Sequence, residues 1–350
     1  MIKVSKAPAL FLGLLTERTF FSCLMAFLIF SSCSHQKTKK IIIAHRGASG
    51  LLPEHTLEGV AMAHAFGVDY IEPDIVLSKD NEAIVLHDIY LESTTNVKNL
   101  FPKRKREDGH YYAVDFSLEE IKKLQVSERV NPKTGKKVYP GRFPLQKSSF
   151  KVPTLKEYIE LIQGLNKSTG QNIGLYPEIK RPSFHEREGK DITSVVMKVL
   201  DQYGYGKGLE KVFVQCFEPK TLIRIRKMNP KIPLVQLIGE SSWFNNGVDY
   251  KAMQTRIGLQ KISTYAQGIG PWIGHVYKKG EQNNDFYQTN LVKWAHEKGL
   301  LVHAYTLRKD QIPSFAKSYK DLLEKVFFQA QVDGAFTDHS METKLMLREH

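Results

Sequence analysis

The sequence Ile41-Ile42-Ile43-Ala44-His45-Arg46-Gly47-Ala48 joins a short apolar run directly to a polar turn. Short runs rich in β-branched residues are typical of buried strands, and a following glycine is a turn signal. The stretch therefore predicts a strand whose carboxyl end carries a histidine and an arginine. Comparable units recur along the rest of the chain.

Short β-rich runs alternate with segments of helical periodicity from this stretch onward. The candidate strands are Ile41–Ala44, Tyr70–Asp74, Asn172–Glu178, Val212–Cys216, Leu234–Leu237, Gly268–Gly270, Leu301–Tyr305 and Val332–Phe336. The helical runs between them include Leu57–Phe66, Leu155–Leu165, Ser194–Tyr203, Asn290–Lys298 and Leu322–Gln329. This alternation indicates an α/β fold with a parallel sheet, and eight strand–helix units predict a closed (β/α)8 TIM barrel.

One stretch departs from the alternation. Ile71–Leu77 and Ala83–His87 are joined by a link that is far too short for a parallel crossover, so we expect a hairpin there. If its turn centres on Asp80-Asn81, His87 lies opposite Asp74. That register would place an imidazole beside a carboxylate at the barrel mouth.

A long segment follows the hairpin. Residues 90–152 are rich in Lys, Pro, Gly and Tyr and exceed the length that a βα loop requires. We expect them to form an insertion over the barrel mouth after the second strand. The domain that contains this insertion is expected to span residues 41–350.

The first 33 residues have the layout of an export signal. Basic residues precede the apolar run Phe20–Phe30, which is shorter than the roughly 20 residues of a membrane span. Ser31-Ser32-Cys33 then resembles a bacterial lipobox, although Phe30 stands where leucine is usual. We expect a lipoprotein-type signal peptide at 1–33, lipidation at Cys33, a tether at 34–40 and a periplasmic or cell-envelope location. An uncleaved anchor and a plain signal with a chance cysteine are the alternatives.

The cysteines exclude a disulfide framework. Cys23 lies within the signal and Cys33 is the candidate lipid site, so only Cys216 remains in the mature chain. An exported protein without disulfides must be held by its core. We expect Cys216 to be a buried apolar residue rather than a nucleophile.

The basic charge does not indicate nucleic-acid binding. The formal net charge is +13 and the pI is about 9.4. The densest basic run, Lys103–Arg106, is short, is followed at once by Glu107-Asp108, and lacks interleaved aromatic residues. We therefore expect a solvated surface and no nucleic-acid partner.

Three acids stand at expected strand ends. In Glu72-Pro73-Asp74 the two carboxylates point to the same side, because side chains alternate along a strand. Glu178 ends another strand and is followed two residues later by Lys180. Converging carboxylates are costly without a cation between them, and hard oxygen ligands favour Mg²⁺ or Ca²⁺. The sequence thus predicts a divalent cation site formed by Glu72, Asp74 and Glu178.

Histidines complete the expected site. His45 and His87 are candidates for general base and general acid, and Arg46 offers a guanidinium group that suits phosphate oxygens. His55 could hold the His45 loop in place, and His303 is an alternative residue at the mouth. We expect solvated positions for other histidines, namely His35, His110, His185 and His350.

The sequence resembles a known family through a series of motifs that covers almost all of the chain from Ile41 onward. The motifs are His45-Arg46-Gly47-Ala48-Ser49, Pro53-Glu54-His55-Thr56, Glu72-Pro73-Asp74, Leu86-His87-Asp88, Tyr176-Pro177-Glu178-Ile179-Lys180, Gln215-Cys216-Phe217 and Phe336-Thr337-Asp338. They resemble the bacterial glycerophosphodiester phosphodiesterases, and within them the longer, exported, periplasmic-type branch. Pro73 and Cys216 stand where those residue types are not required, and neither is expected to carry a proton or a ligand.

The resemblance implies a role for each candidate residue. It implies a TIM barrel with an inserted segment and a cation, Ca²⁺ in preference to Mg²⁺. The implied roles are acid–base catalysis by His45 and His87, cation binding by Glu72, Asp74 and Glu178, phosphate contact by Arg46 and Lys180, and contact with the glycerol by Phe217.

The expected reaction is hydrolysis of glycerophosphocholine, glycerophosphoethanolamine and similar diesters to glycerol 3-phosphate and an alcohol. One histidine would remove the proton of the neighbouring glycerol hydroxyl, which attacks phosphorus, and the other would protonate the departing alcohol. Hydrolysis of an intact phospholipid or a glycerophosphate polymer is one alternative. An anchored surface protein that binds a partner is another.

Overall fold

The computed structural model describes residues 39–208, 210–244, 246–281 and 285–349. The expected signal peptide, Cys33, most of the tether, His35 and His350 lie outside these residues. No helix among the described residues is long and apolar enough to cross a membrane.

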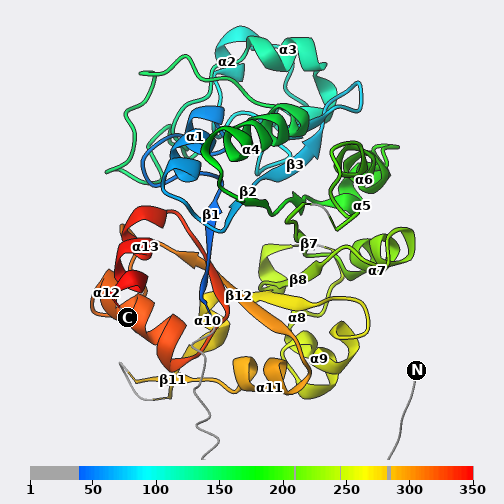
Figure 1. The fold of residues 1–350 in the computed structure, drawn as a ribbon. Helices are drawn as coiled ribbons and strands as arrows, with labels where there is room; N and C mark the ends of the chain where they lie inside the picture. Colours follow the sequence, from blue (N-terminus) through cyan, green and yellow to red (C-terminus); the bar gives the residue numbers. More distant parts are fainter. Residues whose placement is uncertain (1–38, 209, 245, 282–284, 350) are drawn as a thin grey trace, which may run out of the picture. The chain divides into compact units, whose positions relative to one another are not determined.

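The core of the fold is a closed ring of parallel strands, which confirms the predicted α/β barrel (Figure 1). Its eight strand positions are β1 (Ile41–His45), β2 (Tyr70–Glu72) continued by β3 (Asp74–Leu77), β5 (Gly174–Leu175) continued by β6 (Glu178–Ile179), β7 (Val214–Cys216), β8 (Leu234–Ile238), β9 (Gly268–Pro271), β12 (Leu301–Leu307) and β13 (Gly334–Thr337). The ring closes because β1 pairs with β13 on one side and with β2 on the other.

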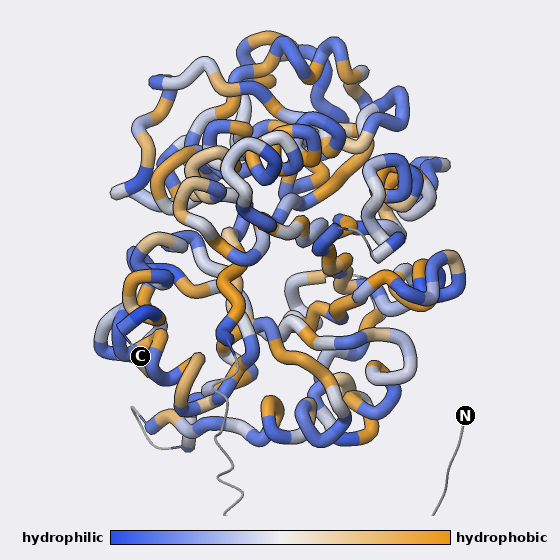
Figure 2. The backbone as a smooth tube through the Cα atoms, in the orientation of Figure 1, coloured by the Kyte–Doolittle hydropathy of each residue, from blue (hydrophilic) through white to orange (hydrophobic). Residues whose placement is uncertain are grey.

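Helices surround the ring (Figure 1). The longer ones are α1 (Leu57–Ala65), α4 (Leu155–Thr169), α6 (Ile192–Gln202), α7 (Pro219–Met228), α9 (Arg256–Ile262), α11 (Leu291–Glu297), α12 (Tyr319–Leu323) with its π-helical continuation η3 (Glu324–Gln329), and α13 (Ser340–Arg348). Short elements complete the barrel: α5 (Pro182–Arg187), η2 (Ser241–Trp243), α8 (Tyr250–Met253), α10 (Ile273–Val276), and the two-stranded sheet of β10 (Tyr277–Lys279) and β11 (Phe286–Gln288). The outer helices mix hydrophobic and hydrophilic residues, as expected for elements with one buried face (Figure 2).

Local sequence signals set several helix starts. The side chain of Thr56 accepts a hydrogen bond from Gly59 N at the start of α1. Thr154 and Glu157 form a reciprocal capping box at the start of α4, which satisfies amides that the first turn leaves free. The helices predicted at 57–66 and 155–165 therefore begin where expected.

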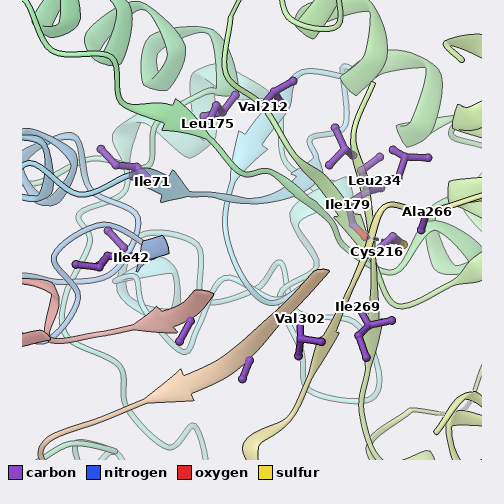
Figure 3. Close-up of a cluster of buried hydrophobic side chains, with 14 of the residues drawn as sticks. Ile42, Ile71, Leu175, Ile179, Val212, Cys216, Leu234, Ala266, Ile269 and Val302 are labelled. Carbon is purple, nitrogen blue, oxygen red and sulfur yellow. Dashed lines mark hydrogen bonds between the residues drawn. The ribbon is translucent and has the colours of Figure 1, made fainter. Parts of the chain in front are cut away.

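Alternation along the strands divides the apolar residues between two layers. Ile42, Ile71, Leu175 and Val302 face outward into the large core between strands and helices (Figure 3). Residues of the opposite parity fill the interior of the ring, namely Ile43, Tyr70, Tyr176, Phe213, Val235 and Phe336. This is the pattern of period two that a strand imposes, and it makes the barrel a packed core rather than a pore.

Two prolines interrupt the ring at the level of the acids. Pro73 separates β2 from β3, and Pro177 lies between β5 and β6. Proline has no N–H to donate, but both carbonyls still accept: Pro73 O from Glu178 N at 2.8 Å and Pro177 O from Gln215 N at 3.0 Å. The predicted strand 172–178 is consequently found as two short strands that share one position in the ring.

The predicted hairpin is present, but its predicted register is wrong by one residue. β4 (Ala83–Val85) is antiparallel to β3 with Ile75 opposite Val85. Leu86 N donates to Asp74 O at 2.9 Å, so Leu86 and not His87 lies opposite Asp74. The reason is the turn, in which Ser78 N bonds Glu82 O at 3.0 Å and so centres the loop on Asp80 alone.

The segment between β4 and α4 forms a small layer with its own core. It contains α2 (Val97–Leu100), η1 (Ala113–Asp115) and α3 (Leu118–Lys123). Figure 1 shows α2 and α3 together on the side of the barrel where β3 and α4 lie. Its buried side chains include Leu91, Phe116 and Ile121, and they pack with Val76 and Ile84 of the hairpin. The inserted segment is therefore anchored on the hairpin that also carries His87.

Candidate active site

Three buried carboxylates meet at the proline interruptions. Glu72 ends β2, Asp74 begins β3, and Glu178 begins β6 directly opposite Asp74. Each offers an oxygen within 4.8 Å of the others. The structure thus brings together all three acids predicted as cation ligands.

Burial and mutual repulsion act strongly on this cluster. Burial, and then the charges of Asp74 and Glu178, raise the pKa of Glu72 well above its usual range. Burial raises the pKa of Glu178 to about 8, although Lys180 opposes the shift. Burial also disfavours the charge on Asp74, but Lys180 and the other cationic neighbours hold its pKa well below its usual range. Ionising all three carboxyls at once is therefore unfavourable. A bound cation would stabilise the fully ionised cluster.

Two cationic side chains lie against the carboxylates. The Nζ atom of Lys180 is 2.7 Å from Glu178 Oε1 and 3.5 Å from Asp74 Oδ1. The Nε atom of Arg46 is 3.2 Å from Asp74 Oδ2, and its backbone N–H donates to Glu72 Oε2 at 2.9 Å. Arg46 adopts a left-handed backbone conformation, with φ of 60°, and this turns its amide toward the acid.

The residues present fit a divalent cation. The donors are carboxylate oxygens, which are the ligands that Mg²⁺ and Ca²⁺ prefer. The amide oxygen Oε1 of Gln215 is buried and has no hydrogen-bond partner among the described residues, and Nε2 of the same side chain lies 3.4 Å from Glu72 Oε1. A further oxygen donor is therefore available beside the three acids.

His45 stands at the end of β1, level with Glu72 on the neighbouring strand. Its Nδ1 donates to Oδ1 of Asp338 at 2.6 Å, which fixes the tautomer with Nε2 free to accept. Burial, followed by the charge of Arg46, lowers the pKa of His45 to about 4. The ring is thus a neutral imidazole near pH 7.

His87 follows the hairpin and has the same arrangement. Its Nδ1 donates to Oδ1 of Asp88 at 2.6 Å. Burial, and then the charges of Arg46 and Lys180, lower the pKa of His87 to about 3. The two histidines therefore present matching Nε2 atoms, each backed by a carboxylate.

One cavity of about 360 Å³ connects these groups. Its polar wall contains both histidines, Arg46, Glu72, Glu178 and Lys180, so most of the predicted site residues share it. The rest of the lining is largely aromatic and includes Phe217, Trp243, Trp272, Tyr305 and Phe336. Asp74 lies behind this surface, where it contacts Arg46, Lys180 and His55.

Phe217 belongs to the aromatic lining. Its ring lies 4.6 Å from that of Phe244 and 6.0 Å from that of Tyr305, measured between centroids. The Nζ atom of Lys180 lies 5.7 Å from the centroid of the Phe217 ring, so Phe217 lies where the aromatic lining meets the polar wall.

The sequence did not reveal the residues behind the histidines. Asp88 and Asp338 belong to two of the motifs that resemble the family, Leu86-His87-Asp88 and Phe336-Thr337-Asp338, but the sequence predicted no role for either residue. Burial disfavours their charges, yet neighbouring arginines hold the pKa of both carboxyls well below the usual range. An aspartate next to a candidate histidine, or at the end of a barrel strand, was the available signal.

Other histidines differ from expectation in two cases. His303 is wholly buried inside the ring, hydrogen-bonded to the Tyr176 hydroxyl at 2.8 Å, and does not line the cavity. His185 was expected in solvent but is buried, and its Nε2 accepts from Leu77 N at 3.1 Å. The polar neighbours of His185 in sequence hid its place in a short helix packed against β3.

His55 and Cys216 lie as predicted. His55 donates from Nε2 to Asp74 Oδ2 at 2.9 Å, and its backbone N–H bonds Arg46 O at 3.0 Å, so it supports the loop that follows β1. Cys216 is fully buried, and burial raises the pKa of its thiol.

Comparison with known proteins found one matching family and several relatives that share most of the chain. The pattern of the Glycerophosphoryl diester phosphodiesterase family matches residues 45–342. A glycerophosphodiester phosphodiesterase of Haemophilus influenzae is 41% identical, covering 87% of this chain and 89% of its own length. One of Treponema pallidum is 35% identical, covering 86% and 90% respectively.

Solved structures share the fold at lower identity. A phosphodiesterase of Oleispira antarctica, solved in complex with the product sn-glycerol-3-phosphate, has a TM-score of 0.60 at 20% identity and covers 88% of this chain and 96% of its own. A glycerophosphodiester phosphodiesterase of Agrobacterium tumefaciens has a TM-score of 0.57 at 17% identity and covers 88% and 100%.

Proposed function

Because the chain belongs to the glycerophosphoryl diester phosphodiesterase family and is a glycerophosphodiester phosphodiesterase, we propose that it hydrolyses small glycerophosphodiesters in the cavity at its barrel mouth. The proposed substrates are glycerophosphocholine, glycerophosphoethanolamine and similar diesters. One observation carries this proposal: two carboxylate-backed histidines share a cavity with Glu72 and Glu178, two of three clustered buried acids.

Glu72, Asp74 and Glu178 are the proposed cation ligands. A divalent cation bound there would neutralise charge on the phosphate and polarise the bond to phosphorus. Ca²⁺ is proposed over Mg²⁺, and the support for this choice is the resemblance of the motifs to the exported branch. The donor types alone suit both ions.

His45 and His87 are proposed to exchange protons through Nε2. One histidine enters as the neutral imidazole and takes the proton of the glycerol hydroxyl next to the phosphate, so that this oxygen attacks phosphorus. The other enters as the imidazolium, after taking up a proton from solvent, and donates that proton to the departing alcohol. Water then opens the resulting cyclic phosphate with the roles exchanged, leaving glycerol 3-phosphate. The lowered pKa of each ring keeps the histidine that acts as base unprotonated at neutral pH. The histidine that acts as acid depends on the carboxylate behind it, and on the anionic phosphate of the bound substrate, to stabilise its imidazolium form.

Arg46, Lys180 and Phe217 are proposed to bind the substrate. The two cations line the same wall as the histidines, where their charges suit phosphate oxygens. Phe217 lines the same cavity, with its ring 5.7 Å from Lys180 Nζ, and is proposed to offer an apolar surface to the carbon atoms of the glycerol. The attacking hydroxyl belongs to the glycerol, so we expect strict recognition of the glycerol and tolerance of the leaving alcohol.

The test is release of glycerol 3-phosphate from glycerophosphocholine by the purified protein, with Ca²⁺, with Mg²⁺ and after chelation. We expect His45→Ala, His87→Ala and Glu72→Ala to lose at least about a hundredfold in kcat. His110→Ala is the matched control, because His110 pairs with Glu92 in the insertion, away from the cavity. Undiminished turnover after chelation, or in either cavity histidine variant, would contradict the proposal.

An intact phospholipid, a glycerophosphate polymer or a binding role without catalysis is not favoured. The relatives that match most of the chain are named as glycerophosphodiester phosphodiesterases. The same assay run with phospholipid vesicles distinguishes these substrates from the small diesters.

We also propose that the protein is exported and anchored to a membrane by lipid on Cys33. The support is the sequence alone: a basic start, a short apolar run and a lipobox-like Ser31-Ser32-Cys33. Metabolic labelling with a fatty-acid analogue in a bacterial host should mark the wild type and not Cys33→Ser. Equal labelling of both would remove the anchor from the proposal.

A further inference from the structure

Two buried arginines of the insertion reach the carboxylates behind the histidines. Both come from the stretch 126–150, which we call the arginine segment. It is fixed to the rest of the insertion by backbone hydrogen bonds from Ser127 N to Thr94 O and from Val130 N to Ser93 O, each at 2.8 Å. Neither arginine was singled out by the sequence, and the proposed mechanism does not use them.

Arg129 links the carboxylate partner of His87 to the carboxylate partner of Arg46. Its Nη1 donates to Asp88 Oδ2 at 2.6 Å, while Asp88 Oδ1 accepts from His87. Its Nε and Nη2 grip Glu54 at 2.9 and 2.6 Å, and Glu54 in turn accepts from Arg46 at 3.0 and 3.1 Å. A continuous ionic chain therefore runs from Arg46 through Glu54, Arg129 and Asp88 to His87.

Arg142 makes the corresponding contact on the other side. Its Nη2 donates to Asp338 Oδ2 at 2.7 Å, while Asp338 Oδ1 accepts from His45. Its Nε and Nη2 also hold Asp310 at 2.7 and 3.0 Å. Asp338 Oδ2 receives a second donor, Arg308 Nε, also at 2.7 Å.

We propose that Arg129 and Arg142 are positioning residues, through which the arginine segment holds Asp88 and Asp338 so that the histidines aim Nε2 into the cavity. The inference rests on the proposed acid–base role of His45 and His87. It assigns the insertion a part in turnover: the barrel supplies the histidines, and the insertion fixes their orientation.

The physical reason lies in the freedom of an aspartate side chain. A carboxylate held at one oxygen by imidazole alone can rotate and carry the ring with it. A second strong donor on the other oxygen removes that freedom, and charge-assisted contacts to arginine are both short and directional. Misplacement of a reacting group by about 1 Å can cost on the order of a hundredfold in rate.

The two contacts are not equivalent. Among the described residues, Asp88 receives a guanidinium only from Arg129, whereas Asp338 receives both Arg142 and Arg308. Loss of Arg129 should therefore disturb the orientation of His87 more than loss of Arg142 disturbs the orientation of His45. A role limited to attaching the insertion would not predict this order.

The test compares kcat and KM of Arg129→Ala, Arg129→Lys and Arg142→Ala with wild type on glycerophosphocholine. We expect Arg129→Ala to lower kcat by about 10- to 100-fold with little change in KM, and Arg142→Ala to lower it less. Added guanidinium, far below denaturing concentration, should restore part of the rate of Arg129→Ala. Arg106→Ala is the matched control, because Arg106 grips Asp115 and Glu188 in the same two-carboxylate manner but touches neither histidine pair.

A double variant separates this inference from the proposed function. In a His87→Ala background, Arg129→Ala should cause no further loss of kcat, because the residue it positions is gone. Wild-type turnover by His87→Ala would contradict the proposed function itself, because that function assigns acid–base catalysis to His87. An inactive His87→Ala together with a fully active Arg129→Ala would overturn only the positioning role, as would equal losses in Arg129→Ala and Arg106→Ala.

Discussion

Glu72→Gln should make the chelated protein more stable while it abolishes turnover. The three acids hold oxygens within 4.8 Å of one another, and Glu72 is 1% exposed. Burial and the two neighbouring acids raise the pKa of Glu72 well above its usual range, so folding at pH 7 protonates a carboxyl that is ionised in the unfolded chain. That proton uptake costs about 1.4 kcal/mol for each pH unit by which the pKa is raised, up to the working pH. Glutamine avoids this cost, so we expect a gain of about 1 to 2 kcal/mol in the free energy of unfolding.

The substitution leaves the local hydrogen bonds in place. The amide oxygen of glutamine can still accept from Arg46 N, which now bonds Glu72 Oε2 at 2.9 Å. Its new N–H group faces Gln215, whose Oε1 has no partner and can accept after the Gln215 amide rotates. The rotation exchanges one unpaired atom of Gln215, Oε1, for another, Nε2, so the number of unpaired buried atoms does not rise.

The assay is thermal unfolding followed by circular dichroism, in chelator and in excess Ca²⁺. For wild type, a cation at a hundred times its Kd should add about 2.7 kcal/mol, and Glu72→Gln should lose most of that response. Glu92→Gln is the control: Glu92 is equally buried but accepts from His110 Nδ1 at 2.5 Å and Tyr111 N at 3.1 Å. That variant should be less stable than wild type and keep the full Ca²⁺ response. If Glu72→Gln instead destabilises the chelated protein as much as Glu92→Gln does, the reasoning from like charges is wrong.

Three more predictions concern groups outside the cavity. Burial, and then the charge of Glu54, raise the pKa of Glu128 from 4.5 to about 7, so the stability it contributes is complete below about pH 4.5 and is lost as pH rises through 7. Denaturant titrations should show wild type losing about 1 to 2 kcal/mol relative to Glu128→Gln between those limits, and parallel curves would refute the shift. Tyr176→Phe removes the hydroxyl that bonds His303 and should cost about 1 to 3 kcal/mol of stability, with kcat preserved. Cys216, buried with a raised thiol pKa, should react with a thiol reagent only after unfolding, so rapid labelling of the native protein would contradict the placement.

The ring of strands could be predicted because each strand carries its own signal. Apolar runs such as Ile41–Ala44 and Leu234–Leu237 are short, are bounded by turn residues and lie between helical segments, and β1 and β8 are found there. The weaker predictions were those that depend on a single turn. The hairpin register shifted by one residue because Ser78 and Glu82 close a loop whose centre no propensity specifies.

The cavity residues were predictable because they stand at strand ends, and the barrel brings all such ends together. The carboxylates and arginines that contact those residues could not be predicted in this way, because they lie far away in the sequence. His45 and Asp338 are 293 positions apart, and Arg142 and Asp338 are 196 apart. Nothing in the local pattern of either residue specifies the other, because the contact depends on the closure of β13 against β1.

The insertion shows most clearly what the local pattern cannot give. Its length and composition predicted an extra layer over the mouth, which needs no information about individual contacts. Arg129 is not distinguishable in sequence from the exposed basic residues of the same segment, since its burial comes from Glu54, 75 positions earlier, and Asp88, 41 positions earlier. A buried arginine is tolerated only where carboxylates surround it, and those carboxylates are fixed by the barrel. The conformation of the insertion and that of the loops that carry the histidines therefore depend on each other. We expect a substitution in either one to change the conformation of the other.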